Sequence, residues 1–153
     1  MPETKPGWIA PAALVVAVVS VALAVWALVR SPSSDDSKLT ADEAKAQVCQ
    51  AFDMVRKAVS LQTNANLGPD RIAIEAVAAN ARLATLGGGQ FLLARLDEGP
   101  VPADLDDAVR SFANQLEYIG MGQLAGAAGD DPGQTTRMTE AQVSAERALE
   151  LCK

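Results

Sequence analysis

The sequence PADLDDAVRSFANQLEYIG (residues 102–120) has the clearest helical pattern in this chain of 153 residues. Its large apolar side chains recur at intervals of three and four, which places them on one face of an α-helix. These residues are Leu105, Val109, Phe112, Leu116 and Ile119. Asp104, Asp106 and Asp107 lie near the start, where carboxylates interact favourably with the helix dipole. The segment therefore predicts an amphipathic helix that buries one face in a helical core.

Two helices are expected on the N-terminal side of this segment. The first begins at Thr40, because Glu43 follows at the spacing of a reciprocal capping box, and it ends before residues 64–68. Its apolar face consists of Val48, Phe52, Val55 and Val59. The second begins at Asp70, directly after Pro69. Its first apolar residues are Ile74, Val77, Ala78 and Ala81.

A fourth helix is expected after a glycine-rich loop over residues 120–133. Its apolar side consists of Met138, Ala141, Ala145, Ala148 and Cys152. No stretch shows the alternation of apolar and polar residues that is typical of a β-strand. Short connections favour antiparallel packing of neighbouring helices. The sequence therefore predicts an all-α domain over residues 39–153, folded as an antiparallel four-helix up-and-down bundle.

The two cysteines are expected at the same end of this bundle. Cys49 lies near the start of the first helix and Cys152 is the next-to-last residue, so the topology makes them candidate disulfide partners. A bond closing a loop of about 100 residues would stabilise the fold by up to about 4.7 kcal/mol, and it requires an oxidising compartment. The alternative is two unrelated buried thiols in a reducing cytoplasm.

Three consecutive glycines, Gly87, Gly88 and Gly89, interrupt the second helix. Each costs about 1 kcal/mol relative to alanine inside a helix, so they mark a break, a kink or a close approach of another backbone. The helix either ends here or continues to Leu96. We expect close packing against the alanine-lined fourth helix, and a hinge or a gap that admits a ligand is the alternative.

The stretch WIAPAALVVAVVSVALAVWALV (residues 8–29) is 22 residues long and carries no charge. As a helix it would extend about 33 Å, enough to cross a hydrocarbon core of about 30 Å. Trp8 and Trp26 lie near its ends, where indoles favour the headgroup level. We predict a retained transmembrane helix, a signal anchor, after a short tail (residues 1–7) and before a polar linker (residues 30–38).

A cleavable signal peptide is the alternative to this anchor. The apolar run is too long for the core of a signal peptide, and Lys5 is the only basic residue before it. The residues before Arg30 also lack a small-x-small cleavage site. A retained anchor therefore agrees better with the sequence.

Small residues form a stripe along the predicted transmembrane helix, at steps of three and four. They are Ala10, Ala13, Ala17, Ser20, Ala24 and Ala27. Such a stripe lets a second helix approach closely in lipid. We expect a contact with a protein partner or with a second copy; an alanine-rich composition would produce the same stripe by chance.

The orientation of the anchor is indicated by two opposing signals. Lys5 precedes the anchor, whereas Arg30, Lys38 and Lys45 follow it, which by the positive-inside rule would keep the domain in the cytoplasm. The proposed disulfide favours the other side of the membrane. The basic residues are few, so we give the disulfide more weight and predict a single-pass plasma-membrane protein with an extracytoplasmic C-terminal domain.

The composition excludes most kinds of chemistry. The chain contains no histidine, which removes the commonest general base and zinc ligand, and its two cysteines are not a CxxC pair. The glycines near residue 120 follow a helix and lack the spacing of a nucleotide-binding loop. Residues 31–153 carry 11 basic and 18 acidic side chains, a net charge of −7, which argues against nucleic acid. We predict no enzyme, no metal site and no cofactor.

Polar side chains are scattered over the helices rather than clustered. If one surface recognises a partner, the region around Asn80, Arg82 and Gln90 beside the three glycines is the first candidate. Arg82 and Arg95 flank the glycines and are expected to pair with acidic residues of adjacent helices. A solvated face with ion pairs is the simpler interpretation.

The segments AVAANARLATLGGGQFLLARLD (residues 76–97), PADLDDAVRSFANQL (residues 102–116) and the terminal LCK resemble small alanine-rich, single-pass membrane proteins of actinobacteria, of the mycobacterial type. The resemblance covers most of the chain after the predicted anchor. It implies a cell-envelope setting with the domain outside the plasma membrane, and it carries over no catalytic or binding residue.

These observations predict an accessory, scaffold or interaction subunit of a cell-envelope assembly. The alternative is a tethered module that holds a lipid or another apolar ligand between its helices. A pocket lined by Leu86, Phe91, Phe112 and Leu116 would favour the ligand-binding module. A tight alanine-packed core with an exposed apolar patch would favour the interaction subunit.

Overall fold

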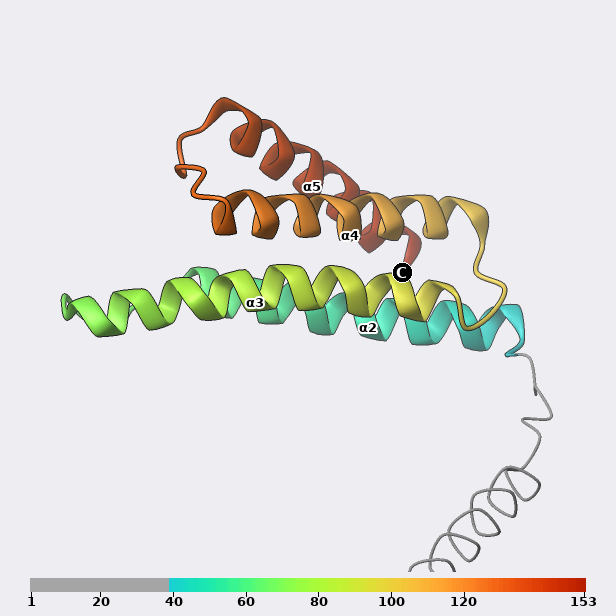
Figure 1. The fold of residues 1–153 in the computed structure, drawn as a ribbon. Coiled ribbons are helices and arrows are strands. Elements are labelled where there is room, and N and C mark those ends of the chain that lie inside the picture. The colour runs from blue at the N-terminus through green and yellow to red at the C-terminus, as the bar shows by residue number, and fades with distance from the viewer. Residues whose placement is uncertain (1–38) are drawn as a thin grey trace, which may run out of the picture. The chain divides into compact units, whose positions relative to one another are not determined.

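A computed structural model describes residues 39–153 and shows four α-helices in this part of the chain. They are α2 (Ala41–Thr63), α3 (Arg71–Leu96), α4 (Ala103–Leu124) and α5 (Pro132–Leu151), shown in Figure 1. No strand occurs among these residues, so the prediction of an all-α domain with four helices is confirmed. The predicted anchor, residues 8–29, lies outside the described residues. Within residues 39–153, no helix has the length and apolar character needed to span a bilayer.

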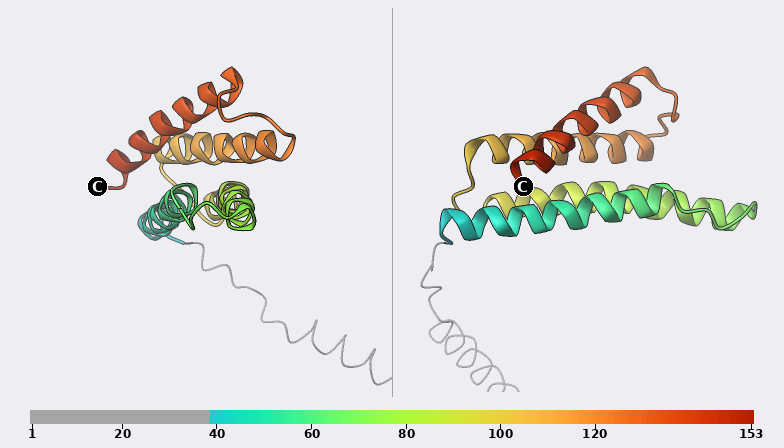
Figure 2. Two further views of the ribbon diagram at one scale, coloured as in Figure 1. Left: turned by 90° about the vertical axis from the view of Figure 1, so that its left-hand side faces the viewer. Right: turned by 180° about the vertical axis from the view of Figure 1, so that it is seen from behind.

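The helices are arranged in layers, and each packs on its neighbour in the sequence. In Figure 2, α2 and α3 lie side by side, α4 lies over this pair, and α5 crosses the far side of α4. Such contacts between successive helices are those of a helical bundle. As a result α4 is the central helix, with neighbours on two sides.

The helix starts follow the capping signals of the sequence. Thr40 and Glu43 form the complete capping box: the Thr40 N–H donates to Glu43 Oε2 at 2.9 Å, and the Glu43 N–H donates to Thr40 Oγ1 at 3.3 Å. The bond from the backbone of Thr40 lowers the pKa of the Glu43 carboxyl. Asp70 caps α3 through the N–H of Ala73 at 3.0 Å. Local hydrogen bonds therefore fix both starts.

The core is centred on α4 and on the halves of α2 and α3 that α4 covers. The five apolar residues expected on the buried face of α4 are all buried, which confirms this part of the prediction. Phe112 packs edge to face against Phe52 of α2, with ring centroids 5.3 Å apart, a favoured aromatic geometry. Leu92 and Leu96 of α3 close the core beside this aromatic pair.

The first half of α3 is far less buried than its sequence suggests. Ile74 is 56% exposed, and Val77, Ala78 and Ala81 are only half-buried. The prediction that these four residues form a buried face is therefore wrong for Ile74 and only partly right for the rest. The turn between α2 and α3 extends beyond the end of α4, so α2 lies beside this half of α3 but α4 does not cover it (Figure 1).

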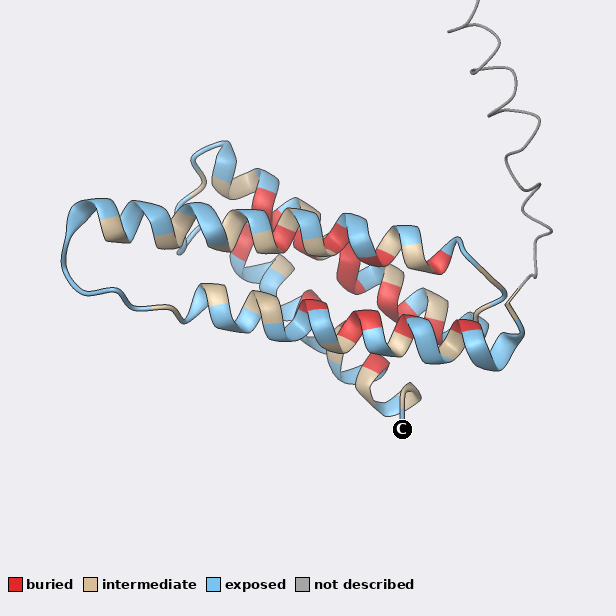
Figure 3. Cartoon of the chain, turned by 90° about the horizontal axis from the view of Figure 1, so that it is seen from below, coloured by how far each residue is buried: buried red, intermediate tan, exposed pale blue. Residues whose placement is uncertain are grey.

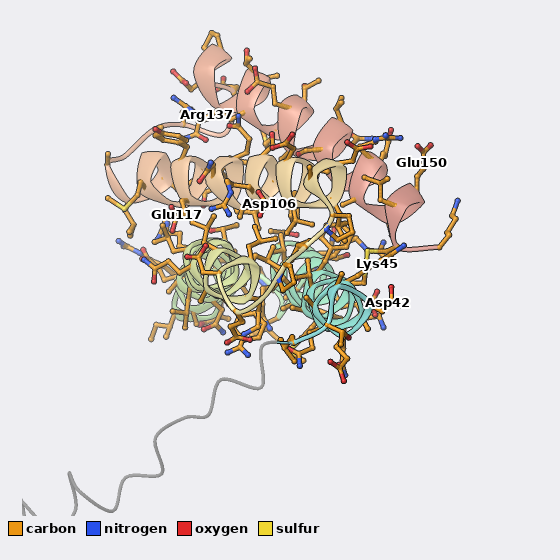
Figure 4. The ribbon with its side chains drawn as sticks, turned by 90° about the vertical axis from the view of Figure 1, so that its right-hand side faces the viewer. Asp42, Lys45, Asp106, Glu117, Arg137 and Glu150 are labelled. Carbon is orange, nitrogen blue, oxygen red and sulfur yellow. A yellow bond between two sulfur atoms is a disulfide. The ribbon has the colours of Figure 1, made fainter. Side chains whose placement is uncertain are left out.

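The three glycines lie within a continuous α3, and two of them are sites of close helix packing. A Cβ atom on Gly88 would lie 2.6 Å from Val55 Cγ1 of α2. One on Gly89 would lie 2.7 Å from the carbonyl oxygen of Ala113 in α4, beside Glu117, which extends toward α3 in Figure 4. Close approach is confirmed, but α5 is the wrong partner: the neighbours are α2 and α4. Gly87 has no neighbour within 4 Å.

The loop before α5 is shorter than the glycines suggested. Helix α4 continues to Leu124, so Gly120 and Gly122 are helical and the prediction of a loop from residue 120 is wrong. The physical reason is again close packing, because a Cβ atom on Gly120 would lie 2.6 Å from Leu86 Cγ of α3. On α5, Ala141 and Ala148 are buried as expected, whereas Met138 is 44% exposed.

Substitution of Gly89 and Gly87 should separate the effect of helix packing on the free energy of unfolding from the effect of helix propensity. Gly89→Ala should lower the free energy of unfolding, because its methyl group would overlap backbone atoms of α4 that cannot rotate away. Gly87→Ala should instead raise it by up to about 1 kcal/mol, since the methyl group enters open space and alanine favours the helix. Urea unfolding at low protein concentration measures both. Changes of the same sign would contradict the α3–α4 packing.

Candidate functional site

The sequence predicted one covalent link between distant parts of the domain, a disulfide between its two cysteines. Cys49 and Cys152 lie at disulfide-bonding distance, with their Cα atoms 5.6 Å apart, and both pack against the core. The pairing is therefore confirmed. Because it joins the start of α2 to the end of α5, it fixes the last helix to the first layer.

The described residues show no arrangement typical of catalysis. Both cysteines of the chain are used in the disulfide, so neither is a free thiol. Over residues 39–153, no group of three histidine, cysteine, aspartate or glutamate side chains is placed to hold a metal ion. The shifted ionisable groups have structural partners: hydrogen bonding to Lys57 lowers the pKa of Asp53, and the bidentate bond with Asp106 raises the pKa of Arg110.

A groove of about 710 Å³ lies between α4 and α5. Its lining residues are Asp104, Asp107, Ala108, Ser111, Gln115, Thr139, Glu140, Val143, Ser144 and Arg147. Gln115 Nε2 donates to Glu140 Oε2 at 2.6 Å across the groove, while the buried Gln115 Oε1 has no hydrogen-bond partner. Eight of the ten lining residues have polar or charged side chains, and Ala108 and Val143 are the two apolar ones.

The residues of the predicted apolar pocket are not gathered around this groove. Phe112 and Leu116 are closed within the core, and Leu86 packs against Gly120. Phe91 of α3 is 38% exposed, with the Arg95 guanidinium carbon 5.1 Å from its ring centroid. The four side chains therefore do not line one common pocket.

The outer face of α3 is the most unusual surface in the described part of the chain. We use the name α3 outer face for seven exposed residues at steps of three and four: Ile72, Ala76, Ala79, Leu83, Gly87, Gln90 and Ala94. None of them is ionisable. The four charged residues of α3 are Arg71, Glu75, Arg82 and Arg95; Glu75 borders the face beside Ile72 and Ala79, and the helical period places the other three on other sides. Figure 3 shows exposed residues along much of this helix.

The exposure of the large residues on this face is high. Ile72 is 80% exposed and Leu83 is 70% exposed. A surface helix normally has polar residues on its solvent side, and a helix that is apolar all round is normally buried. Helix α3 instead lies at the edge of the domain with an uncharged face that exposes Ile72 and Leu83, so a further surface is expected to cover this face.

The predicted recognition residues are only partly brought together. Gln90 belongs to the α3 outer face, and Asn80 is exposed at its edge. Arg82 is half-buried on the flank. Arg95 pairs with Glu98 at 2.8 Å in its own segment, so the expected pairing with an adjacent helix is wrong for this residue. Sequence reasoning missed Ile72 and Leu83, although their place in one uncharged series at steps of three and four was a usable signal.

The comparisons with known proteins add no family. No protein-family model, curated protein or solved structure matched this chain. The small-residue stripe of the predicted anchor (Ala10, Ala13, Ala17, Ser20, Ala24 and Ala27) lies outside the described residues. A functional proposal therefore depends on the surfaces of residues 39–153 and on the apolar N-terminal sequence.

Loss of the disulfide should weaken the fold without removing its helices. The double variant Cys49→Ser, Cys152→Ser should unfold at lower urea, by up to about 4.7 kcal/mol in the chain-entropy estimate for a loop of this length. Wild-type protein treated with reductant is the matched control and should show the same loss. Non-reducing mass spectrometry of freshly extracted, alkylated protein should find the linked peptide. Two free thiols would contradict an oxidised domain.

Proposed function

We propose that this protein is a membrane-anchored, extracytoplasmic helical domain that acts as an accessory, scaffold or interaction subunit of a cell-envelope assembly. One observation carries the proposal: the α3 outer face is exposed, uncharged and apolar over most of the helix. Contiguous apolar surface of this kind is typical of protein contact sites. The domain is an antiparallel up-and-down bundle in this proposal, with α4 central and α3 left open on one side.

The proposed contact face differs from the rest of the domain surface. Helix α4 carries Asp104, Asp106, Asp107 and Glu117 against a single Arg110. Helix α5 carries three glutamates and two arginines. Carboxylates are depleted at the centre of protein interfaces because burying a charge is costly. The α3 outer face is free of this cost, which supports contact through α3 rather than through α4 or α5.

The membrane anchor and the orientation are supported by separate observations. Residues 8–29 have the length and apolar character of a transmembrane helix. The pairing of Cys49 with Cys152 supports an oxidising compartment. None of Leu86, Phe91, Phe112 and Leu116 lines the groove between α4 and α5, which gives little support to the alternative of an apolar-ligand module built from these residues. An interaction subunit therefore agrees best with the surface of the domain.

Protease accessibility should establish the anchor and its direction. The full chain with a C-terminal epitope should remain in the membrane after alkaline carbonate extraction. Protease added to cells with an opened outer envelope and an intact plasma membrane should remove the epitope. An epitope protected until the plasma membrane is lysed would contradict the extracytoplasmic placement, and release by carbonate would contradict the anchor.

A charge on the α3 outer face should dissociate the assembly. In the intact membrane, Leu83→Glu should reduce the crosslinked complex to one chain, because the carboxylate would have to be buried without a partner. The matched control is Val143→Glu, since Val143 is 63% exposed on α5, outside this face. Chemical crosslinking in the membrane followed by denaturing electrophoresis gives the mass of the complex. A single chain in the wild type, or equal effects of both variants, would contradict the proposed contact.

A further inference from the structure

We propose that the α3 outer face is the contact between two copies of this chain, α3 against α3, with the helices parallel. The inference rests on the proposed function, because the proposed membrane anchor is the tether that holds both copies in one membrane. The other possible occupants of this face are outcomes of the test below. The argument depends on three properties of the face: its open glycine, its repeat and its size.

Packing inside the domain does not explain why residue 87 is a glycine. Gly88 and Gly89 have neighbours that a side chain would strike, on α2 and α4, whereas Gly87 has nothing within 4 Å. A glycine inside a helix costs about 1 kcal/mol relative to alanine. It is useful where another backbone approaches closely. No part of residues 39–153 approaches Gly87, so a close contact from outside the described domain would account for a glycine at this position.

The residues of the face repeat at an interval of eleven. Ile72, Leu83 and Ala94 are each eleven residues apart, and so are Ala76 and Gly87. Eleven residues make three helical turns at about 3.67 residues per turn, close to the period of a straight α-helix. The face therefore runs nearly straight along α3. A second straight helix can follow it from Ile72 to Ala94 without a strong supercoil.

Two parallel copies match this face residue for residue. In a parallel pair related by a twofold axis, each position meets its own counterpart. Ala76, Ala79 and Gly87 then meet small residues, which lets the two backbones approach, and Leu83 packs against Leu83 between them. No carboxylate or ammonium group has to be buried. Arg71 and Arg95, which lie off the face, already have carboxylates in their own chain, Glu75 at 3.9 Å and Glu98 at 2.8 Å.

The size of the face favours a tethered copy over a partner from solution. A helix strip from residue 72 to residue 94 is about 33 Å long and about 10 Å wide, or about 330 Å² per copy. Stable complexes of free proteins bury about 600 Å² or more per partner. In the proposed function two chains are tethered in one membrane, and tethering raises their effective concentration. A small self-complementary contact is then sufficient.

Site-specific photo-crosslinking of the full chain in its native membrane tests the pairing. A photoreactive phenylalanine analogue at Leu83 should give a product of two chains, with the new bond mapped to α3 of the second copy. The same analogue at Val143 is the control and should give no such product. Adding Gly87→Leu to the Leu83 probe should lower the yield about tenfold or more, the effect of overpacking a close contact. That side chain enters open space in the single domain, so the Cys49–Cys152 link and the unfolding midpoint should be retained.

The results that would overturn the pairing of two copies differ from the result that would overturn the proposed function. A crosslink from Leu83 to a different protein, no crosslink, or equal products from Leu83 and Val143 would each overturn the pairing of two copies. A crosslink to a different protein would leave the proposed function intact, because an interaction subunit would then have another partner. Release of the full chain by alkaline carbonate would overturn the proposed function itself and is measured independently.

Discussion

The close approach of α3 and α4 is the constraint on which the rest of the domain depends. Gly89 of α3 lies against the backbone of α4 at Ala113, and Gly120 of α4 lies against Leu86 of α3. Each helix therefore contributes a glycine to the same contact, at positions where a side chain would force the helices apart. This contact makes α4 the central helix, so that one of its sides covers α2 and α3 while the other carries α5.

The same constraint determines which surfaces remain open. Because α4 is already packed against α5, α3 is left at the edge of the domain with its first half beyond the end of α4 (Figure 1). Most of its buried residues lie in the second half. The opposite side remains apolar and uncharged, and Gly87 is open there although Gly88 and Gly89 are packed. Packing within the domain thus explains two of the three glycines, and contact with another molecule would explain the third.

Several parts of the fold could be predicted from the sequence because their causes are local. The capping residues Thr40 and Asp70 set helix starts through hydrogen bonds within four residues, and the apolar positions of α4 follow the helical period. The cysteine pair followed from the order of the helices. Glycines are different: Gly120 reads as a loop residue, and only its neighbour in space, Leu86, shows that it is a packing site. The exposure of Ile74 likewise depends on where α4 ends.

The α3 outer face was harder to predict from the sequence, because its exposure also depends on which helices lie beside it in space. An uncharged helix face with large apolar residues indicates burial, and only the three-dimensional arrangement shows that this face of α3 lacks a cover. The most direct measurement is hydroxyl-radical footprinting of the Leu83 side chain in the full chain. We predict strong modification in detergent at a detergent-to-protein ratio high enough to hold one chain per micelle, and weak modification in the native membrane, with Val143 modified equally in both. Equal modification of Leu83 in the two conditions would contradict a covered α3 outer face.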